Sequence, residues 1–444
     1  MRTPICNFVK RYTERNSIRL HMPGHKGKVF SDDITEIHGL DSLYQDKGVI
    51  FESEQNAAGL FDSEKTCYST EGASLCVKSM LHLAKTVNCT TGRGTVLAGR
   101  NAHSSFISAA CLADFDVCWL YGKEDNYLSC DIDEKEVEDA ILSCKEKPFA
   151  LFVTSPDYLG NMADIKSLSR VCKKHKIMLL VDNAHGAYTK FLWESEHPLD
   201  LGADMCCDSA HKTLSALTGG AYLHISKSAP KKEELCAYAK SVMSLYGSTS
   251  PSFPILCSLD MMNREIATGG YKDKLLTNIE RLSLIKKFLE VYGYTLIGKE
   301  KLKLTIDTLS YGYTGAEFNS ILEKNNIFCE FFDRSFIVFM ISHNTEMREL
   351  EYLESVLLSI HAREKIEEKH FSVVKCDQKM SIREAMLSKK ELVSVENSLG
   401  RIFASPTLSC PPAVSVIVCG EEINESAIEL LKQLGTNEVL VTKE

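Results

Sequence analysis

The chain has 444 residues, of which 44 % are hydrophobic and 25 % are charged, with 25 glycines and 11 prolines. This composition excludes disordered, collagen-like and small disulfide-rich proteins, and at roughly 150 residues per domain it predicts about two or three domains. The formal net charge of −9 provides no overall basic field, so we expect neither nucleic acid nor an anionic membrane as a partner.

The 17 cysteines are scattered, and only Cys206 and Cys207 are adjacent. Because there is no C-x-x-C pair and no regular histidine spacing, the sequence predicts no zinc ribbon or finger and no other metal site. The N-terminal residues are charged and contain no signal-peptide core, and no window of about 18 apolar residues is present. We therefore expect a cytoplasmic protein with reduced thiols and no membrane span.

In chain order, the sequence predicts four segments: an N-terminal arm with loops (1–65), a large domain (66–300), a small α/β lobe (301–365) and a C-terminal domain (366–444). The large domain is predicted from short apolar runs that alternate with amphipathic segments of helix length. These runs lie at 94–99, 149–155, 177–182 and 220–225. The pattern predicts an α/β fold with a mostly parallel sheet and helices on both faces.

Two polar residues follow predicted strands of this domain. Asp182 ends an apolar run at the carboxyl end of a parallel strand, where open α/β sheets bind ligands. Lys212 follows thirty positions later in the segment DSAHKTL, between Ser209 and a glycine pair that ends at Gly220. Asp182 is a candidate ion-pair partner for a protonated ring nitrogen, and the alternative is that Asp182 itself caps the following helix. Lys212 is a candidate Schiff-base residue, and the alternative is an ordinary surface lysine.

Two further segments contain candidate ligand-binding residues. Ser69, Thr70 and Gly72 lie at the start of a predicted helix, where backbone N–H groups favour a phosphate, although such residues also serve as simple helix caps. His103 follows the predicted strand at 94–99 and is a candidate for stacking on a planar cofactor, with a solvated loop histidine as the alternative.

The order of these four features resembles the aspartate-aminotransferase-like pyridoxal phosphate enzymes. Within that group, the chain resembles the short members of the Orn/Lys/Arg decarboxylase family. RLHMPGHKG (19–27) is similar to the family's signature, and DITEIHGLDSLYQDKGVI (33–50) to the acidic loop that follows it. SPDYLGNMADI (155–165), STSPSFPILCSLD (248–260) and the tail block at 394–423 also match in order. The resemblance implies a seven-stranded-type sheet and small α/β C-terminal lobes.

The resemblance also implies pyridoxal 5'-phosphate as the cofactor and assigns roles to individual residues. Lys212 would form the Schiff base, Asp182 would pair with the pyridine nitrogen, and His103 would stack on the ring; these three are the catalytic candidates. Further cofactor contacts are implied for small and polar residues: Ser69, Thr70, Gly72, Ala184, His185, Ser209, His211, Lys212, Thr249 and Ser250. Of these, Thr249 and Ser250 would approach from a partner subunit.

The function implied is decarboxylation of a basic amino acid, namely arginine, lysine or ornithine, with arginine as a slight favourite. Two alternatives stay open: an aminotransferase or lyase on the same scaffold, and a catalytically inactive regulatory relative. The family implies a homodimer or a higher homo-oligomer. We expect a partner subunit to cover one face of a helix at 4–15, formed by Ile5, Phe8, Val9 and Tyr12, with the chain's own large domain as the alternative.

The chain departs from the family pattern at several positions. Asn183 replaces the usual Glu after the strand-end aspartate, and Ala210 occupies a usual Thr position. Glu71 and Ala73 stand where small and Asn residues are usual near the phosphate. In the tail, Pro-Pro-Ala-Val-Ser at 411–415 replaces Pro-Pro-Gly-Ile-Pro. These departures leave open which basic amino acid is the substrate and whether activity is retained.

Overall fold

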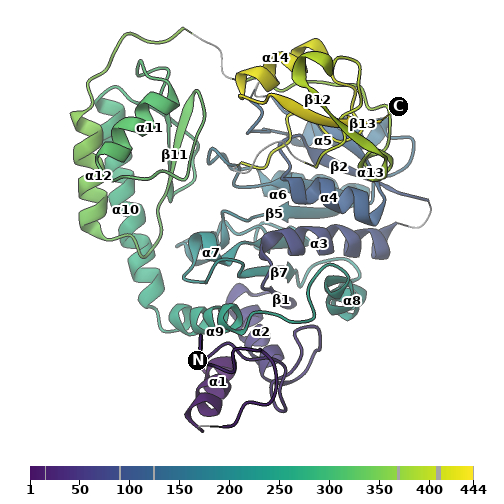
Figure 1. Ribbon diagram of the computed structural model, residues 1–444, viewed down its shortest axis with the longest axis vertical. Coiled ribbons are helices and arrows are strands. Elements are labelled where there is room, and N and C mark those ends of the chain that lie inside the picture. The colour runs from purple at the N-terminus through teal and green to yellow at the C-terminus, as the bar shows by residue number, and fades with distance from the viewer. Residues whose placement is uncertain (16, 90–91, 124–125, 368–370, 407–411, 444) are drawn as a thin grey trace. The chain divides into compact units, whose positions relative to one another are not determined.

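The computed structural model describes residues 1–15, 17–89, 92–123, 126–367, 371–406 and 412–443 (Figure 1). These residues form two compact units. The first unit contains Met1–Gly92, Phe149–Phe152 and Ile165–Lys274, and the second contains Arg93–Pro148, Val153–Asp164 and Leu275–Glu444.

Seven strands form one sheet in the order β1-β7-β6-β5-β4-β2-β3. Their bounds are β1 (Lys65–Ser69), β2 (Thr95–Gly99), β3 (Asp116–Leu120), β4 (Ala150–Thr154), β5 (Met178–Asp182), β6 (Met205–Asp208) and β7 (Ala221–Ile225). β5 pairs in parallel with β6, and β2 with β3, whereas β7 runs antiparallel to β1 and β6. The predicted α/β class with a mostly parallel sheet is confirmed. β2, β4, β5 and β7 coincide with the predicted apolar runs.

The first unit contains seven α-helices and one 3₁₀ helix among its described residues. They are α1 (Pro4–Glu14), α2 (Gly48–Phe61), α3 (Gly72–Asn88), α6 (Ile165–His175), the short α7 (Ala210–Thr213), α8 (Lys232–Ser244) and α9 (Phe253–Ala267), together with the 3₁₀ helix η1 (Ala187–Phe191). α3 packs on β5, β6 and β7, α8 packs on α3, and α6 packs on β5. All residues of β5 and β7 are buried, as expected for strands that helices cover.

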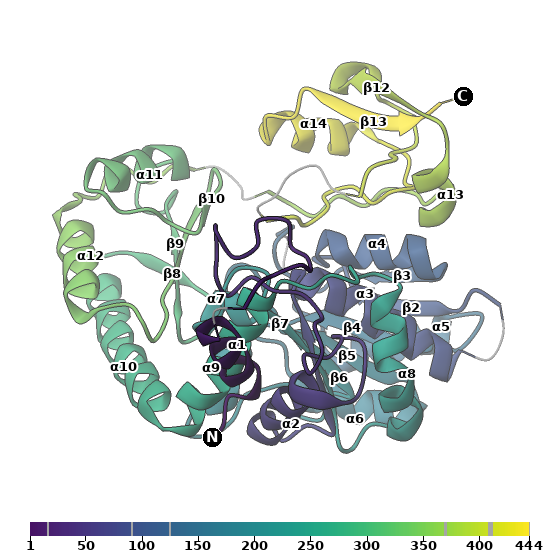
Figure 2. The same cartoon turned by 60° about the horizontal axis from the view of Figure 1, so that its bottom comes forward.

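The second unit contains two smaller sheets. One has the antiparallel order β10 (Phe331–Phe332), β11 (Phe336–Met340), β9 (Lys303–Asp307), β8 (Thr295–Ile297), and the other pairs β12 (Lys390–Ser394) with β13 (Glu438–Thr442). Its helices are α4 (Ser104–Ala113), α5 (Glu134–Ser143), α11 (Gly315–Lys324), α12 (Met347–Ser359), α13 (Ile382–Leu387), α14 (Glu425–Gln433) and the 3₁₀ helix η2 (Val395–Asn397). Figure 2 shows α14 beside β12 and β13.

One long helix, α10 (Gly270–Val291), begins in the first unit and ends in the second. Its second half lies next to α12, to which it is joined by an ion pair of 2.5 Å between Arg281 and Glu354. In the described parts of the chain, every helix is too short or too polar to cross a lipid bilayer.

The N-terminal helix differs from our expectation. α1 packs on α2 and α9 of its own chain, where Ile5 and Val9 are buried and the Cys6 N–H donates to Asp260 Oδ2 at 3.0 Å. The expectation that a partner subunit buries this face is therefore wrong for Ile5 and Val9, because α2 and α9 already provide an apolar surface for them, whereas Phe8 and Tyr12 are only half-buried.

Candidate functional site

The candidate site lies where β5 and β6 end in the first unit. Lys212 belongs to α7, which directly follows β6, and its Nζ lies 2.8 Å from Nε2 of His185, three residues beyond β5. Parallel neighbours present their carboxyl ends at the same edge of a sheet. The pairing of β5 with β6 therefore brings together two residues that are 27 positions apart in the sequence.

Asp182 is the last residue of β5 and is only 4 % exposed. Its Oδ1 accepts a hydrogen bond from the Ala184 N–H at 3.1 Å and lies 3.5 Å from the Cys207 thiol. A carboxylate so deeply buried requires a charged or hydrogen-bonding partner. Asp182 is therefore suited to hold a cationic group of a ligand at this edge of the sheet.

The start of α3 is the predicted position of a phosphate. It follows β1 directly, and three loops meet there: Gly72 donates its N–H to Gly219 O at 2.8 Å, and His211 donates its N–H to Gly220 O at 3.2 Å. The Ser209 hydroxyl lies 3.3 Å from His211 Nδ1. Because the first N–H groups of a helix have no intrahelical acceptor and carry partial positive charge, this junction favours a phosphate-like group.

Gly219 allows the loop to approach α3 closely. Its φ of +97° is unfavourable for other residues, and an added Cβ would lie 2.7 Å from Thr70 O. A side chain at this position would therefore push the loop away from the helix start.

Glu71, the unusual carboxylate beside the helix start, is exposed. Its Oε1 accepts a hydrogen bond of 2.6 Å from the Ser248 N–H, so it fixes the loop that contains Thr249 and Ser250. Both of these residues are exposed in the single chain. Burial of the Tyr44 hydroxyl is the main cause that raises the pKa of Tyr44 to about 12, and the negative charge of Glu71 is the second cause.

His103 lies in the second unit, so its predicted stacking on a cofactor stays a prediction. It caps α4 by accepting the Ser105 N–H at its Nδ1, and it forms an isolated β-bridge with Val414 of the C-terminal tail. Ala413 has a φ of +54°. This left-handed conformation is unfavourable for alanine because of its Cβ, and it would be favourable for the glycine that the family usually has at this position. Pro411, the first residue of the altered tail motif, lies outside the described residues.

A buried ion pair anchors this tail within the second unit. The Arg100 guanidinium donates to Ser415 O at 2.7 Å and to Val416 O at 3.1 Å, and it pairs with Glu421 at 3.2 Å. Sequence reasoning missed this arginine, although it stands in the same segment as His103. A buried arginine needs several acceptors, and only the fold brings these acceptors to it.

Sequence reasoning also missed a buried polar group behind the site. Asn183 donates from Nδ2 to Asp208 Oδ1 at 2.7 Å, and Oδ2 of Asp208 faces His197 and His224 at 3.0 and 3.3 Å. Burial opposes ionisation of Asp208, but the two histidines outweigh it and hold the pKa of this carboxyl well below its usual range. Asn183, which stands where the family usually has a glutamate, thus contacts a buried carboxylate on β6.

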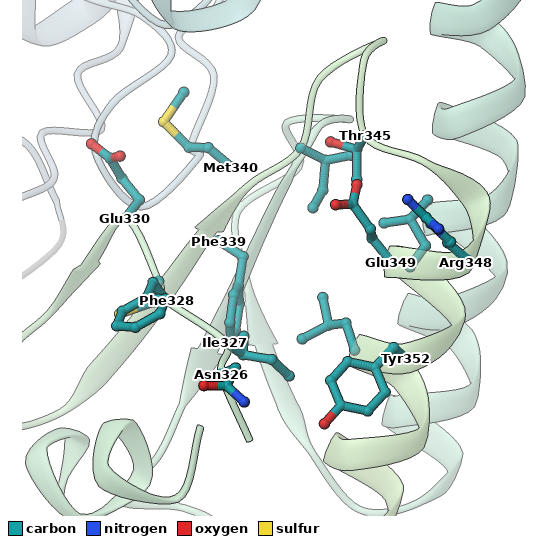
Figure 3. A pocket seen from close by; sticks show the side chains of 14 residues that line it. Asn326, Ile327, Phe328, Glu330, Phe339, Met340, Thr345, Arg348, Glu349 and Tyr352 are labelled. Carbon is teal, nitrogen blue, oxygen red and sulfur yellow. The ribbon is translucent and has the colours of Figure 1, made fainter. Parts of the chain in front are cut away.

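A groove of about 680 Å³ lies elsewhere, in the small lobe of the second unit (Figure 3). It is lined by residues 326–330, β11 and α12, and Phe328, Tyr352 and Arg348 are among its side chains. None of the predicted site residues lines it, so we do not assign the candidate chemistry to it.

Sequence comparisons match almost the whole chain. The sequence model described as Orn/Lys/Arg decarboxylase, major domain, matches residues 3–293, and the one described as Orn/Lys/Arg decarboxylase, C-terminal domain, matches residues 362–439. The chain belongs to the Orn/Lys/Arg decarboxylase family. The resemblance inferred from the motifs is therefore confirmed.

Among curated relatives, the uncharacterized protein YaaO of Bacillus subtilis is 29 % identical, over 98 % of this chain and 94 % of YaaO. The arginine decarboxylases of Halalkalibacterium halodurans and Bacillus subtilis are 27 % and 26 % identical, each over 97 % of this chain and 93 % of theirs.

Solved structures show the same fold at lower identity. The constitutive lysine decarboxylase of E. coli superposes with a TM-score of 0.77 at 16 % identity, over 100 % of this chain and 82 % of that one. Lysine decarboxylase A of Pseudomonas aeruginosa superposes with a TM-score of 0.80 at 16 % identity, over 99 % and 80 %.

The close approach of Gly219 to Thr70 can be tested with two matched variants. Gly269 also has a left-handed φ, +87°, but an added Cβ there meets no atom within 4 Å. Gly269→Ala should lower the free energy of unfolding by about 1–2 kcal/mol through its backbone conformation alone. Gly219→Ala should cost about 1–3 kcal/mol more, because its Cβ also meets the Thr70 carbonyl. Urea denaturation measures both values, and equal costs would contradict the steric argument.

Proposed function

We propose that this chain is a pyridoxal phosphate-dependent decarboxylase of a basic amino acid, with arginine as the substrate. The observation that carries the proposal is the pairing of β5 with β6, which gathers Asp182 and Lys212 at one edge of the sheet in a chain of this family. The choice of arginine is supported by the names of the relatives with 26–27 % identity.

The residues present fit the cofactor in three chemically different ways. Asp182 offers a buried carboxylate for a protonated ring nitrogen, Lys212 offers an amine, and the start of α3 offers N–H groups for a phosphate. One solved structure of similar fold, SPT with PLP, superposes with a TM-score of 0.53 at 12 % identity. When bound, pyridoxal phosphate supplies an electron sink for the electron pair left by the departing carboxylate.

In this proposal, Lys212 would hold the cofactor covalently through its amine. Asp182 keeps a proton on the ring nitrogen, so the ring stays electron-withdrawing. His185, whose Nε2 lies 2.8 Å from Lys212 Nζ, would hold or accept a proton at that nitrogen. The remaining proposed contacts are those to the phosphate, from Ser69, Thr70, Gly72, Ser209 and His211, and those to the ring, from Ala184 and His103.

Product analysis tests this function. The purified protein, supplied with pyridoxal phosphate and arginine, lysine or ornithine in turn, should release carbon dioxide and form agmatine from arginine. Lys212→Ala should abolish both turnover and the visible absorbance of the lysine-bound cofactor, because it removes the covalent anchor. Lys227→Ala, which removes an exposed lysine paired with Asp62, is the matched control.

Near wild-type turnover in Lys212→Ala would refute the role of this lysine. A keto acid as product would favour an aminotransferase. Cofactor absorbance without any product from the three amino acids would favour the inactive regulatory relative, an alternative that Glu71 and the altered tail leave open.

We also propose that the active unit is a homodimer. The segment after α1 exposes five apolar side chains within 13 residues: Ile18 (88 %), Leu20 (90 %), Met22 (66 %), Val29 (76 %) and Phe30 (65 %). Clusters of this kind on a surface mark interaction sites, and a second copy of the chain is the occupant that the decarboxylase family suggests.

Sedimentation velocity checks the assembly. The wild type should sediment as a dimer or larger, and Leu20→Asp should weaken the association at least tenfold, because it places a charge in a buried interface. Leu142→Asp, at a residue of α5 that is 70 % exposed, should leave it unchanged. A wild-type monomer that is fully active at assay concentration would contradict the proposal.

Glu71 gives a further prediction about the cofactor. Glu71→Gln keeps an acceptor for the Ser248 N–H but removes a negative charge beside the start of α3. The affinity for pyridoxal phosphate should rise roughly 2- to 5-fold, as expected for a charge at a helix N-terminus. Equilibrium titration measures this, with Glu233→Gln on α8 as the control for an exposed glutamate. Weaker binding by Glu71→Gln would show that the carboxylate assists the cofactor site.

A further inference from the structure

The N-terminal segment carries a charge opposite to that of the whole chain. Residues 1–30 contain seven lysines and arginines and a single carboxylate side chain, Glu14, although the chain has a formal net charge of −9. Glu14 pairs with Lys10 at 3.9 Å on an exposed face of α1. The arginines of this segment are therefore not neutralised within it, and they create a local positive potential at this end of the first unit.

A pocket of about 390 Å³ lies beside α1 in the first unit. It is lined by side chains of α1, of the segment that follows α1, and of the loop at Ile37 and His38. Phe8 and Tyr12, the two residues of the apolar face of α1 that are only half-buried, form part of its lining. Pockets that bind small molecules begin at about 300 Å³, so this space accommodates a small organic ligand.

Two guanidinium groups line this pocket. Arg11 and Arg15 are both exposed and stand four positions apart, which places them on the same side of α1. Among the described residues, no ion pair or hydrogen bond holds either guanidinium. Arginines at a helix C-terminus offset the partial charge of its last carbonyls, but that charge is only about half a unit. The two groups therefore leave an excess positive charge that an anion between them would neutralise.

The other polar side chains of the lining are also suited to an anion. His38 and Ser17 are exposed, and both residue types can donate a hydrogen bond. The Tyr12 hydroxyl and the Met22 carbonyl oxygen hold the two ring nitrogens of His21, so this histidine shapes the pocket. No carboxylate is present in the described lining, and the pocket therefore contains no group that repels an anion.

The rest of the lining is apolar. Phe8, Ile18 and Ile37 contribute hydrocarbon surface to the same space, and Ile18 is 88 % exposed. A bare inorganic anion would leave this surface in contact with water, whereas an organic group attached to the anion would cover it. Ile18 also belongs to the apolar cluster proposed for the dimer, so the pocket borders that surface.

We propose that this pocket binds a small phosphate ester. A phosphate monoester carries a charge of about −1.5 to −2 near neutral pH and three acceptor oxygens, which matches the two charges of Arg11 and Arg15. Guanidinium groups bind phosphate oxygens through paired N–H donors. Phe8, Ile18 and Ile37 then contact the organic part. The site is independent of the proposed decarboxylase function, since none of its residues is assigned to the cofactor or the substrate.

Equilibrium dialysis of the full chain tests the pocket. The protein is loaded with pyridoxal phosphate, freed of excess cofactor by gel filtration and dialysed against radiolabelled adenosine monophosphate (AMP), the probe for the ester. About one AMP should bind per chain. Arg11→Gln and Arg15→Gln should each weaken binding roughly fivefold or more, because each removes one charge from the phosphate. Lys10→Gln, on the same helix but paired with Glu14 outside the pocket, is the matched control and should bind within about twofold of the wild type.

Unlabelled competitors define the class of ligand. Adenosine lacks the phosphate, inorganic phosphate lacks the organic part, and succinate offers two carboxylates instead. Each should displace labelled AMP roughly tenfold less well than unlabelled AMP does. Circular dichroism checks that every variant is folded. The proposal is overturned by the absence of saturable AMP binding up to about 5 mM, by equal losses in Lys10→Gln and Arg15→Gln, or by a competitor among these three that matches AMP.

Discussion

The parallel pairing of β5 with β6 is the interaction on which the candidate site depends. It is extended by one backbone hydrogen bond beyond β5, from the Asn183 N–H to Cys207 O at 3.0 Å. That bond holds the two chain segments together just where they leave the sheet. These two adjacent strand ends position Lys212, Asp182 and the buried Asp208 that Asn183 contacts.

The antiparallel strand β7 adds a different contribution. Because it runs opposite to β6, the loop before it returns to the edge at which β6 ends, and there its glycines contact the start of α3 and residue 211. A further parallel strand would have placed that loop at the far end of the sheet. One reversed strand thus allows a lysine loop, a glycine loop and a helix N-terminus to meet.

The sequence predicted those features that depend on local patterns. Apolar runs revealed four strands. Asp182 and Lys212 were recognised as candidate ligand-binding residues because each follows a predicted strand. Features that depend on distant segments were not predictable: His197, Asp208 and His224 come from three elements, and no fixed spacing joins them. The face of α1 was predicted as apolar, but which surface covers it depends on α2 and α9, whose packing no motif encodes. The roles of the individual site residues stay predictions.

The anchoring of the C-terminal tail by Arg100 has a consequence for how this enzyme family can diversify. Arg100 contacts the backbone carbonyls of residues 415 and 416, and every residue type provides such a carbonyl. The side chains of this tail can therefore change while its path beside His103 is maintained. A segment held by its backbone is free to acquire new side chains by mutation, and Ala413 and Ser415 stand in this segment where the family usually has glycine and proline.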